Sequence, residues 1–166
     1  MRAEQSRPVG REHGVMLIEA MVAILIFSLG ILGLVALGGQ AVGAQSDAQY
    51  RTEASGIADA IAGEIAVNVD RTGNGANIAA SLPPFSHRAG GANCAYVGAD
   101  ALNPRVLALV NRAATLPGAT AAQQQIIVQN GAGTFNRIEI NLCWRTANDN
   151  AWRRHSYVTY VTGGAN

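Results

Sequence analysis

Residues 20–39 form a strongly apolar stretch without a charged residue, and it begins directly after a single glutamate, Glu19. Its roughly 20 residues, at about 1.5 Å of rise each, form a helix about as long as the hydrocarbon core of a bilayer is thick. A carboxylate at the entrance of such a segment costs on the order of 3 kcal/mol to insert, so we expect it to have a function and a partner. The stretch therefore predicts a membrane-spanning helix with a functional carboxylate at its start.

An ordinary secretory signal peptide is one interpretation of this N-terminus. Its positively charged residues would be Arg2, Arg7 and Arg11, and residues 42–44 would form a small-residue cleavage site. The apolar segment is longer than the usual apolar region of about 7–15 residues, however, and Glu19 would lie inside it. A plain uncleaved anchor is the second interpretation. It accounts for the length of the segment but gives no role to Glu19.

The third interpretation is a class III signal, in which a short charged leader ends at Gly14 and is cut off there. The mature chain then begins at Val15, whose new α-amino group lies four residues, or about one helical turn, from Glu19. These two opposite charges can neutralise each other within one subunit or between neighbours. This interpretation gives both the glycine and the glutamate a role, which the other two do not.

The N-terminal sequence also resembles a known family. Residues 14–27, Gly-Val-Met-Leu-Ile-Glu-Ala-Met-Val-Ala-Ile-Leu-Ile-Phe, are similar to the N-termini of type IV pilins and of the pseudopilins of type II secretion. The continuation at residues 28–34, Ser-Leu-Gly-Ile-Leu-Gly-Leu, is most similar to minor pilins of the PilV type, the type IV pilus modification proteins. Ala36 stands where many major pilins have a proline, which favours a minor pilin.

The resemblance implies a function in assembly. A prepilin peptidase and methylase would cut after Gly14 and N-methylate Val15. An inner-membrane assembly platform would then move the subunit into a pilus made of other minor and major pilins, for motility or adhesion. Glu19 would provide register and charge neutralisation in the packing of the helices. A minor pseudopilin of a type II secretion system is the alternative within the same structural class.

The charge distribution predicts the orientation in the inner membrane. Three arginines lie in the leader and no comparable cluster follows Gly39, so the positive-inside rule places the N-terminus in the cytoplasm and the C-terminal part in the periplasm, and later on the pilus at the cell surface. The formal charge of +1 falls to zero once the leader, with its three arginines and two glutamates, is removed. A neutral chain has no overall field that attracts nucleic acid, so we predict no specific nucleic-acid partner.

These observations divide the chain into four parts. Residues 1–14 are the leader, 15–39 the membrane and filament-core helix, 40–70 its amphipathic continuation, and 71–166 a periplasmic globular head. The continuation is amphipathic because apolar residues at spacings of three and four share one side of a helix. These residues are Tyr50, Ala54, Ile57, Ala58, Ile61, Ile65 and Val69. We expect a single helix over residues 17–70.

The head changes from loop-like to strand-like composition. Residues 71–102 are rich in Gly, Asn, Ser and Pro, which argues against long regular elements, and Asn103-Pro104 predicts a helix start. Period-two patterns then predict strands at residues 126–128, 138–144 and 152–162, with a tight turn at Asn130-Gly131 and another at residues 148–150. We therefore expect an α+β fold in which the amphipathic half of the N-terminal helix packs on a small antiparallel sheet, as the resemblance to pilins also implies.

Two cysteines, Cys94 and Cys143, fall in the predicted periplasmic head. In an oxidising compartment such a pair favours a disulfide, because two isolated thiols without nearby histidines make a poor zinc site. Free buried thiols are the alternative. The closed loop of about 50 residues corresponds to about 4 kcal/mol in the chain-entropy model.

The sequence contains no motif for catalysis, a metal or a cofactor. It has no nucleophile elbow, zinc-protease motif or phosphate-binding glycine loop. His13 falls in the leader, and we expect Ser86 and His87 to be exposed loop residues. Residues 152–155, Trp-Arg-Arg-His, could stack on bases and neutralise phosphates, which leaves a pilus-borne adhesin or DNA-uptake module as a further alternative. A solvated edge strand protected by charge is the simpler interpretation of this cluster.

Overall fold

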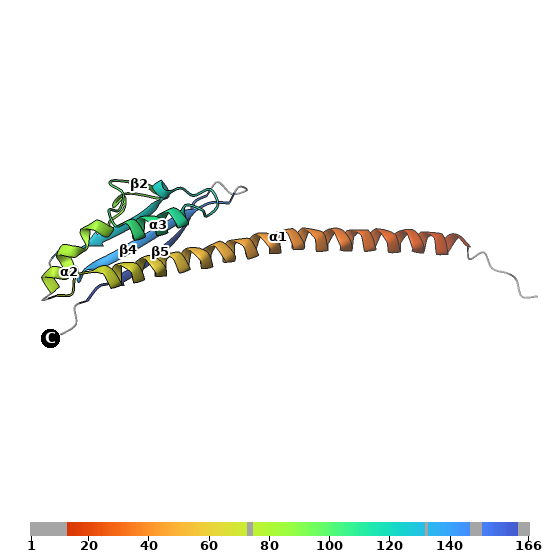
Figure 1. Cartoon of the computed structure of the whole chain (residues 1–166). Helices are drawn as coiled ribbons and strands as arrows, with labels where there is room; N and C mark the ends of the chain where they lie inside the picture. Colours follow the sequence, from red (N-terminus) through yellow and green to blue (C-terminus); the bar gives the residue numbers. More distant parts are fainter. Residues whose placement is uncertain (1–12, 73–74, 132, 147–150, 163–166) are drawn as a thin grey trace, which may run out of the picture. The chain divides into compact units, whose positions relative to one another are not determined.

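The first helix dominates the chain. In the computed structural model, which describes residues 13–72, 75–131, 133–146 and 151–162, helix α1 runs without interruption from His13 to Asn68 (Figure 1). The chain divides into two units, residues 1–47 and 48–166, and α1 contributes to both. The expected helix over residues 17–70 is thus present with its ends shifted by a few residues.

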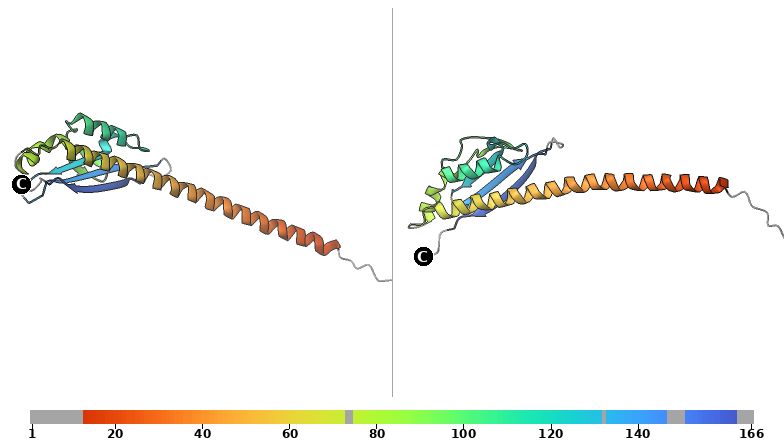
Figure 2. Two further views of the ribbon diagram at one scale, coloured as in Figure 1. Left: turned by 60° about the horizontal axis from the view of Figure 1, so that its bottom comes forward. Right: turned by 45° about the vertical axis from the view of Figure 1, so that its right-hand side comes forward.

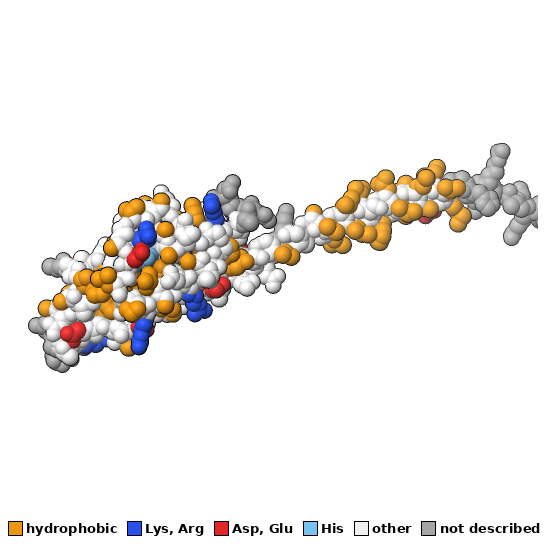
Figure 3. All heavy atoms as spheres, turned by 45° about the horizontal axis from the view of Figure 1, so that its top comes forward, with side chains coloured by type: hydrophobic (Ala, Val, Ile, Leu, Met, Phe, Trp, Pro, Cys, Tyr) orange, Lys and Arg blue, Asp and Glu red, His pale blue; other side chains and the backbone are white. Residues whose placement is uncertain are grey.

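Within the first unit, α1 is apolar on all sides. The described side chains from Val15 to Leu37 are all exposed, as Figure 3 shows by the hydrophobic atoms along this part of the helix. Among the described residues, α1 is the one helix that is long and apolar enough to cross a membrane by length and composition. A lipid bilayer or other apolar helices would remove this surface from water.

Within the second unit, the continuation of α1 buries one side. Ala54, Ile57, Ala58, Ile61 and Ile65 are each at most 1% exposed and belong to a single core cluster with residues of the sheet. Full burial of each isoleucine is worth about 1.5–3 kcal/mol. The amphipathic stripe predicted from spacing therefore covers the sheet.

The sheet has three antiparallel strands in the order β3 (Gln124–Gln129), β4 (Arg137–Trp144) and β5 (Arg153–Tyr160). Residues 138, 140, 142 and 144 of β4 face α1 and are completely buried. We expected β4 to be half-buried, with its other face in water. That expectation is wrong for Asn141 and Cys143, which are also buried because a second, smaller sheet lies near this half of the outer face.

The segment before the sheet contains several short elements. They are α2 (Gly75–Ser81), the 3₁₀ turn η1 (Pro83–Phe85), the strands β1 (Gly90–Ala92) and β2 (Ala95–Val97), α3 (Pro104–Ala113) and the 3₁₀ turn η2 (Ala121–Gln123). Strands β1 and β2 pair as a separate antiparallel hairpin. The prediction that long regular elements are absent from residues 71–102 is correct, but it did not foresee this hairpin.

Helix α3 begins as its sequence predicts. The side chain of Asn103 accepts hydrogen bonds from the backbone N–H groups of Arg105 and Val106, at 3.0 and 3.1 Å, and Pro104 occupies the first turn. This arrangement satisfies two donors that have no partner inside the helix. Val106, Val110 and Ala113 then face the core.

Strands β3 and β4 form the hairpin that Asn130-Gly131 predicted, but their connection is longer than a two-residue turn. The connection spans residues 130–136, and its last two residues, Phe135 and Asn136, adopt positive φ angles of 53° and 51°. Asn130 donates a side-chain hydrogen bond to the carbonyl oxygen of Ala79 in α2, at 2.8 Å. This tertiary contact uses the asparagine that we assigned to a local turn. The turn predicted at residues 148–150 lies outside the described residues.

Candidate functional site

The predicted processing and assembly residues lie at the start of α1. Gly14 and Val15 are in its first turn, and Glu19 follows one turn later on an exposed surface. Residues i and i+4 of a helix lie on the same side, so Val15 and Glu19 are neighbours on one helical face. Residues 1–12, most of the proposed leader, lie outside the described part of the chain.

Glu19 has no partner among the described residues of its own subunit. No described residue forms a hydrogen bond or ion pair with its carboxylate, and the side chains around it are apolar and exposed, Ile18 and Val22 among them. In an apolar environment such a carboxylate requires a counter-charge. None of the described residues supplies that counter-charge.

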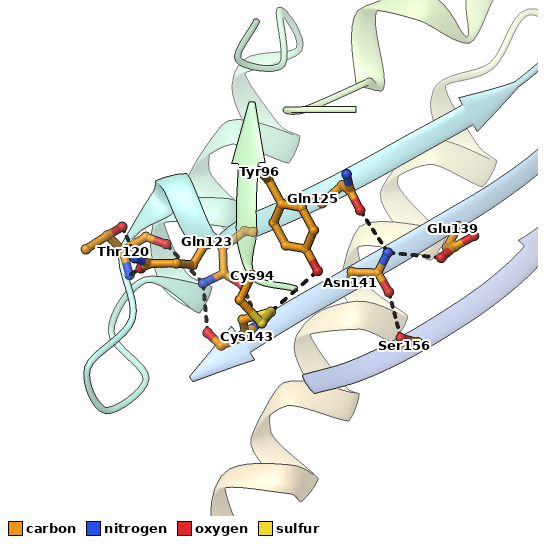
Figure 4. The surroundings of a disulfide bond; sticks show 10 residues. Cys94, Tyr96, Thr120, Gln123, Gln125, Glu139, Asn141, Cys143 and Ser156 are labelled. Atoms are coloured by element: carbon orange, nitrogen blue, oxygen red, sulfur yellow. Dashed lines mark hydrogen bonds between the residues drawn. A yellow bond between two sulfur atoms is a disulfide. The ribbon is translucent and has the colours of Figure 1, made fainter. Parts of the chain in front are cut away.

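The two cysteines form a disulfide, as predicted. Cys94 and Cys143 are joined with an S–S distance of 2.06 Å and a sequence separation of 49. The bond connects the β1–β2 hairpin to the outer face of β4 (Figure 4). Tyr96 packs beside it with its hydroxyl 3.5 Å from Sγ of Cys143, and Trp152 covers the same small cluster.

A row of polar side chains crosses the three strands next to the disulfide. Asn141 donates to Oε1 of Gln125 at 3.0 Å and accepts from the hydroxyl of Ser156 at 2.6 Å (Figure 4). Asn141 also donates to Glu139 at 3.0 Å. This hydrogen bond is the main cause that lowers the pKa of Glu139; hydrogen bonding and charge from Arg137, 2.8 Å away, add to it, whereas burial opposes it. Gln125 and Asn141 are buried and hydrogen-bonded to their neighbours in the row, so we assign the row a structural role.

The cluster at residues 152–155 does not form one continuous binding surface. Trp152 is half-buried against the disulfide, with the guanidinium of Arg145 at 4.8 Å from its ring centre. Arg154 is exposed and, with Trp152, lines a pocket of about 320 Å³. His155 lies on the opposite side of the strand, which faces α1. The side chains therefore divide between two faces of β5.

His87 is buried, so the expectation that it is an exposed loop residue is wrong. Its Nδ1 accepts a hydrogen bond from the N–H of Ala101 at 3.2 Å, and its Nε2 lies 3.1 Å from the carbonyl oxygen of Ala121. Its backbone bridges to Ile126 of β3. These contacts give His87 a structural role. The described residues contain no group of three or more His, Cys, Asp or Glu placed to hold a metal ion.

Comparison of the chain with protein-family models, with curated proteins and with solved structures finds no match.

Proposed function

We propose that this chain is a minor pilin of the type IV pilus, similar to the PilV type, and that it acts in assembly. Prepilin peptidase cuts after Gly14, and the new N-terminus at Val15 is methylated. The apolar half of α1 holds the subunit in the inner membrane, with its N-terminus in the cytoplasm. The assembly platform then transfers the subunit into a filament of major and minor pilins.

The observation that carries this proposal is the contrast between the two halves of α1. The described side chains from Val15 to Leu37 are exposed, whereas Ala54, Ile57 and Ile61 are buried against a sheet. A single helix thus combines a long unpartnered apolar surface with a folded, disulfide-containing unit. That combination suits a subunit whose apolar half contacts lipid first and the helices of neighbouring subunits later.

Glu19 provides the chemistry of this transfer. In a filament, the carboxylate of one subunit pairs with the α-amino group of a neighbour, because both charges would otherwise lie unpaired among apolar helices. The pair therefore fixes the axial position of one helix relative to the next.

The test is the incorporation of Glu19→Ala. Loss of the carboxylate makes membrane insertion easier by up to about 3 kcal/mol, so anchoring and processing should remain intact. The neighbour's ammonium loses its counter-charge, so the amount of the variant in the sheared pilus fraction, relative to the inner membrane, should fall at least ten-fold.

Ser28→Ala is the matched control. Ser28 lies in the same exposed apolar segment, on the opposite face of the helix from Glu19, and its hydroxyl donates to the carbonyl oxygen of Ile24 in its own helix, at 2.7 Å. This variant should enter pili as the parent does. Equal incorporation of Glu19→Ala and the parent would show that the carboxylate has no pairing role. Incorporation into a type II secretion pseudopilus instead of a pilus would assign the chain to the other assembly.

A further inference from the structure

The two edges of the three-stranded sheet differ. At the β3 edge, the backbone of His87 exchanges two hydrogen bonds with Ile126, at 3.0 and 2.8 Å. The side chain of Gln125 in addition donates to the carbonyl oxygens of Arg88 and Gly90. The segment that carries η1 and β1 therefore covers this edge at Gln125 and Ile126.

The other edge, formed by β5, is open. No described strand pairs with its outer side, and β5 is the outermost strand in both views of Figure 2. Sheet edges are normally protected by charged residues, proline, a bulge or a short strand. β5 has eight residues and no proline, and its charged residues are confined to its first half. Val158 and Tyr160, 41% and 54% exposed, lie in the unprotected half.

A groove runs beside this edge on the side that faces α1. It has a volume of about 590 Å³ and is lined by Arg51, Thr52, Ser55, Gly56 and Asp59 of α1 and by His155 of β5. A Cβ atom at Gly56 would meet no atom within 4 Å, so the groove is open at this point. Alternate side chains of a strand added beside β5 would point into this groove, and the others would point to the outer face.

We propose that the β5 edge binds an extended segment of a second protein by adding a strand to the sheet. The segment has small side chains on its groove side and an acidic residue opposite Arg154 on the outer face, because the start of β5 is basic whereas its end is uncharged. A second copy of this chain fits less well. Strand β5 contains no acidic residue, so pairing with β5 of a second copy, parallel or antiparallel, gives Arg154 no counter-charge.

The probe is a synthetic peptide of alternating threonine and valine that ends in two aspartates. Its binding to the full-length protein in detergent is measured by fluorescence anisotropy. We expect saturable binding that slows hydrogen exchange of β5 amides, and Val158→Lys should weaken it at least ten-fold, because a lysine on an edge opposes strand pairing. Arg154→Ser should weaken it several-fold and reduce its dependence on salt.

The matched control is Gln129→Lys, which places the same charge at an exposed position of the covered β3 edge. It should leave peptide binding unchanged. A peptide with a central proline should not bind, since proline lacks the N–H that pairs strands. Equal losses for Val158→Lys and Gln129→Lys, no binding of the acidic peptide, or unchanged binding of the proline peptide would each overturn the proposal. A homodimer that Val158→Lys abolishes would do the same, because the edge would then bind a second copy.

Discussion

Removal of the disulfide should destabilise the second unit by about 4 kcal/mol. The perturbation is the double variant Cys94→Ala/Cys143→Ala, which leaves no free thiol. The bond closes a loop with a sequence separation of 49. In the chain-entropy model, a loop of this length restricts the unfolded chain by about 14 cal/mol/K, or about 4 kcal/mol at 25 °C. That figure is a large part of the 5–15 kcal/mol that is roughly typical of a whole domain.

The same substitution should loosen one region before the rest. Only two residues of the hairpin β1–β2, Cys94 and Tyr96, are buried, and both belong to the disulfide cluster. The remaining residues of both strands are exposed. Without the bond, hydrogen exchange should accelerate in the hairpin far more than in β4. Helix α1 within the first unit should be unaffected.

The assay is urea unfolding of the full-length protein in detergent, followed by the fluorescence of Trp144 and Trp152. Trp144 is completely buried in the main core, and Trp152 lies half-buried beside the disulfide, so the two report on neighbouring regions. Val97→Ala serves as the control, because it shortens an exposed side chain of the same hairpin without changing a crosslink. If the free energy of unfolding of the double cysteine variant lies within roughly 1 kcal/mol of the parent's value, loop closure does not account for this stability.

Two further predictions concern the processing of the N-terminus and the pH dependence of stability. Intact-mass analysis of the membrane-extracted protein should show loss of residues 1–14 and addition of one methyl group, whereas Gly14→Val should leave the precursor; a mature chain that begins at Gln45 would instead indicate a secretory signal peptide. Because its folded-state pKa is lowered, Glu139 stabilises the fold above its ordinary pKa of about 4.3, and this contribution is lost as the pH falls through the lower folded-state value. Glu139→Gln should therefore lose less stability than the parent in that acidic range, and identical pH profiles in urea titrations would contradict this.

The long helix and the main sheet could be predicted because local patterns determine them. The uncharged run after Glu19 and the spacing of Ile57, Ile61 and Ile65 each identify a helical surface without reference to any other segment. The alternation of apolar and polar residues likewise identifies the strands β4 and β5. It wrongly predicted, however, that the outer face of β4 is exposed to water. That face is covered by a segment about 50 residues earlier in the chain, and period-two patterns carry no information about such a contact.

The hairpin β1–β2 could not be predicted for a related reason. Its first strand, Gly90–Ala92, has neither β-branched nor aromatic residues, and all three residues are exposed. Its geometry needs positive φ angles at Gly91, Asn93 and Cys94, and a Cβ at Gly91 would collide with the carbonyl oxygen of Ala95. The disulfide and the hydrogen bonds of Gln125 hold the hairpin in place, so its position depends on tertiary contacts and not on strand propensity.

The importance of Glu19 could be predicted from the sequence, but the open edge of β5 could not. A lone carboxylate in an apolar run is visible in the sequence because its cost depends on its immediate neighbours. The state of a sheet edge depends on strand order and on what covers the other edge. Here that cover is His87, which the sequence indicated as an exposed loop residue.

The disulfide also determines how the protein responds to tension. A load applied between the N-terminal helix and the C-terminus passes through Cys94 and Cys143 and bypasses the chain between them. At roughly 3.3–3.6 Å per extended residue, about 160–175 Å of contour length is withheld from stretching. The withheld segment includes α3, β3 and nearly all of β4, so the strands that cover the stripe of α1 cannot be drawn out as an extended tether while the bond is intact. Under a pulling force the protein would therefore lengthen only through the chain outside this covalent loop.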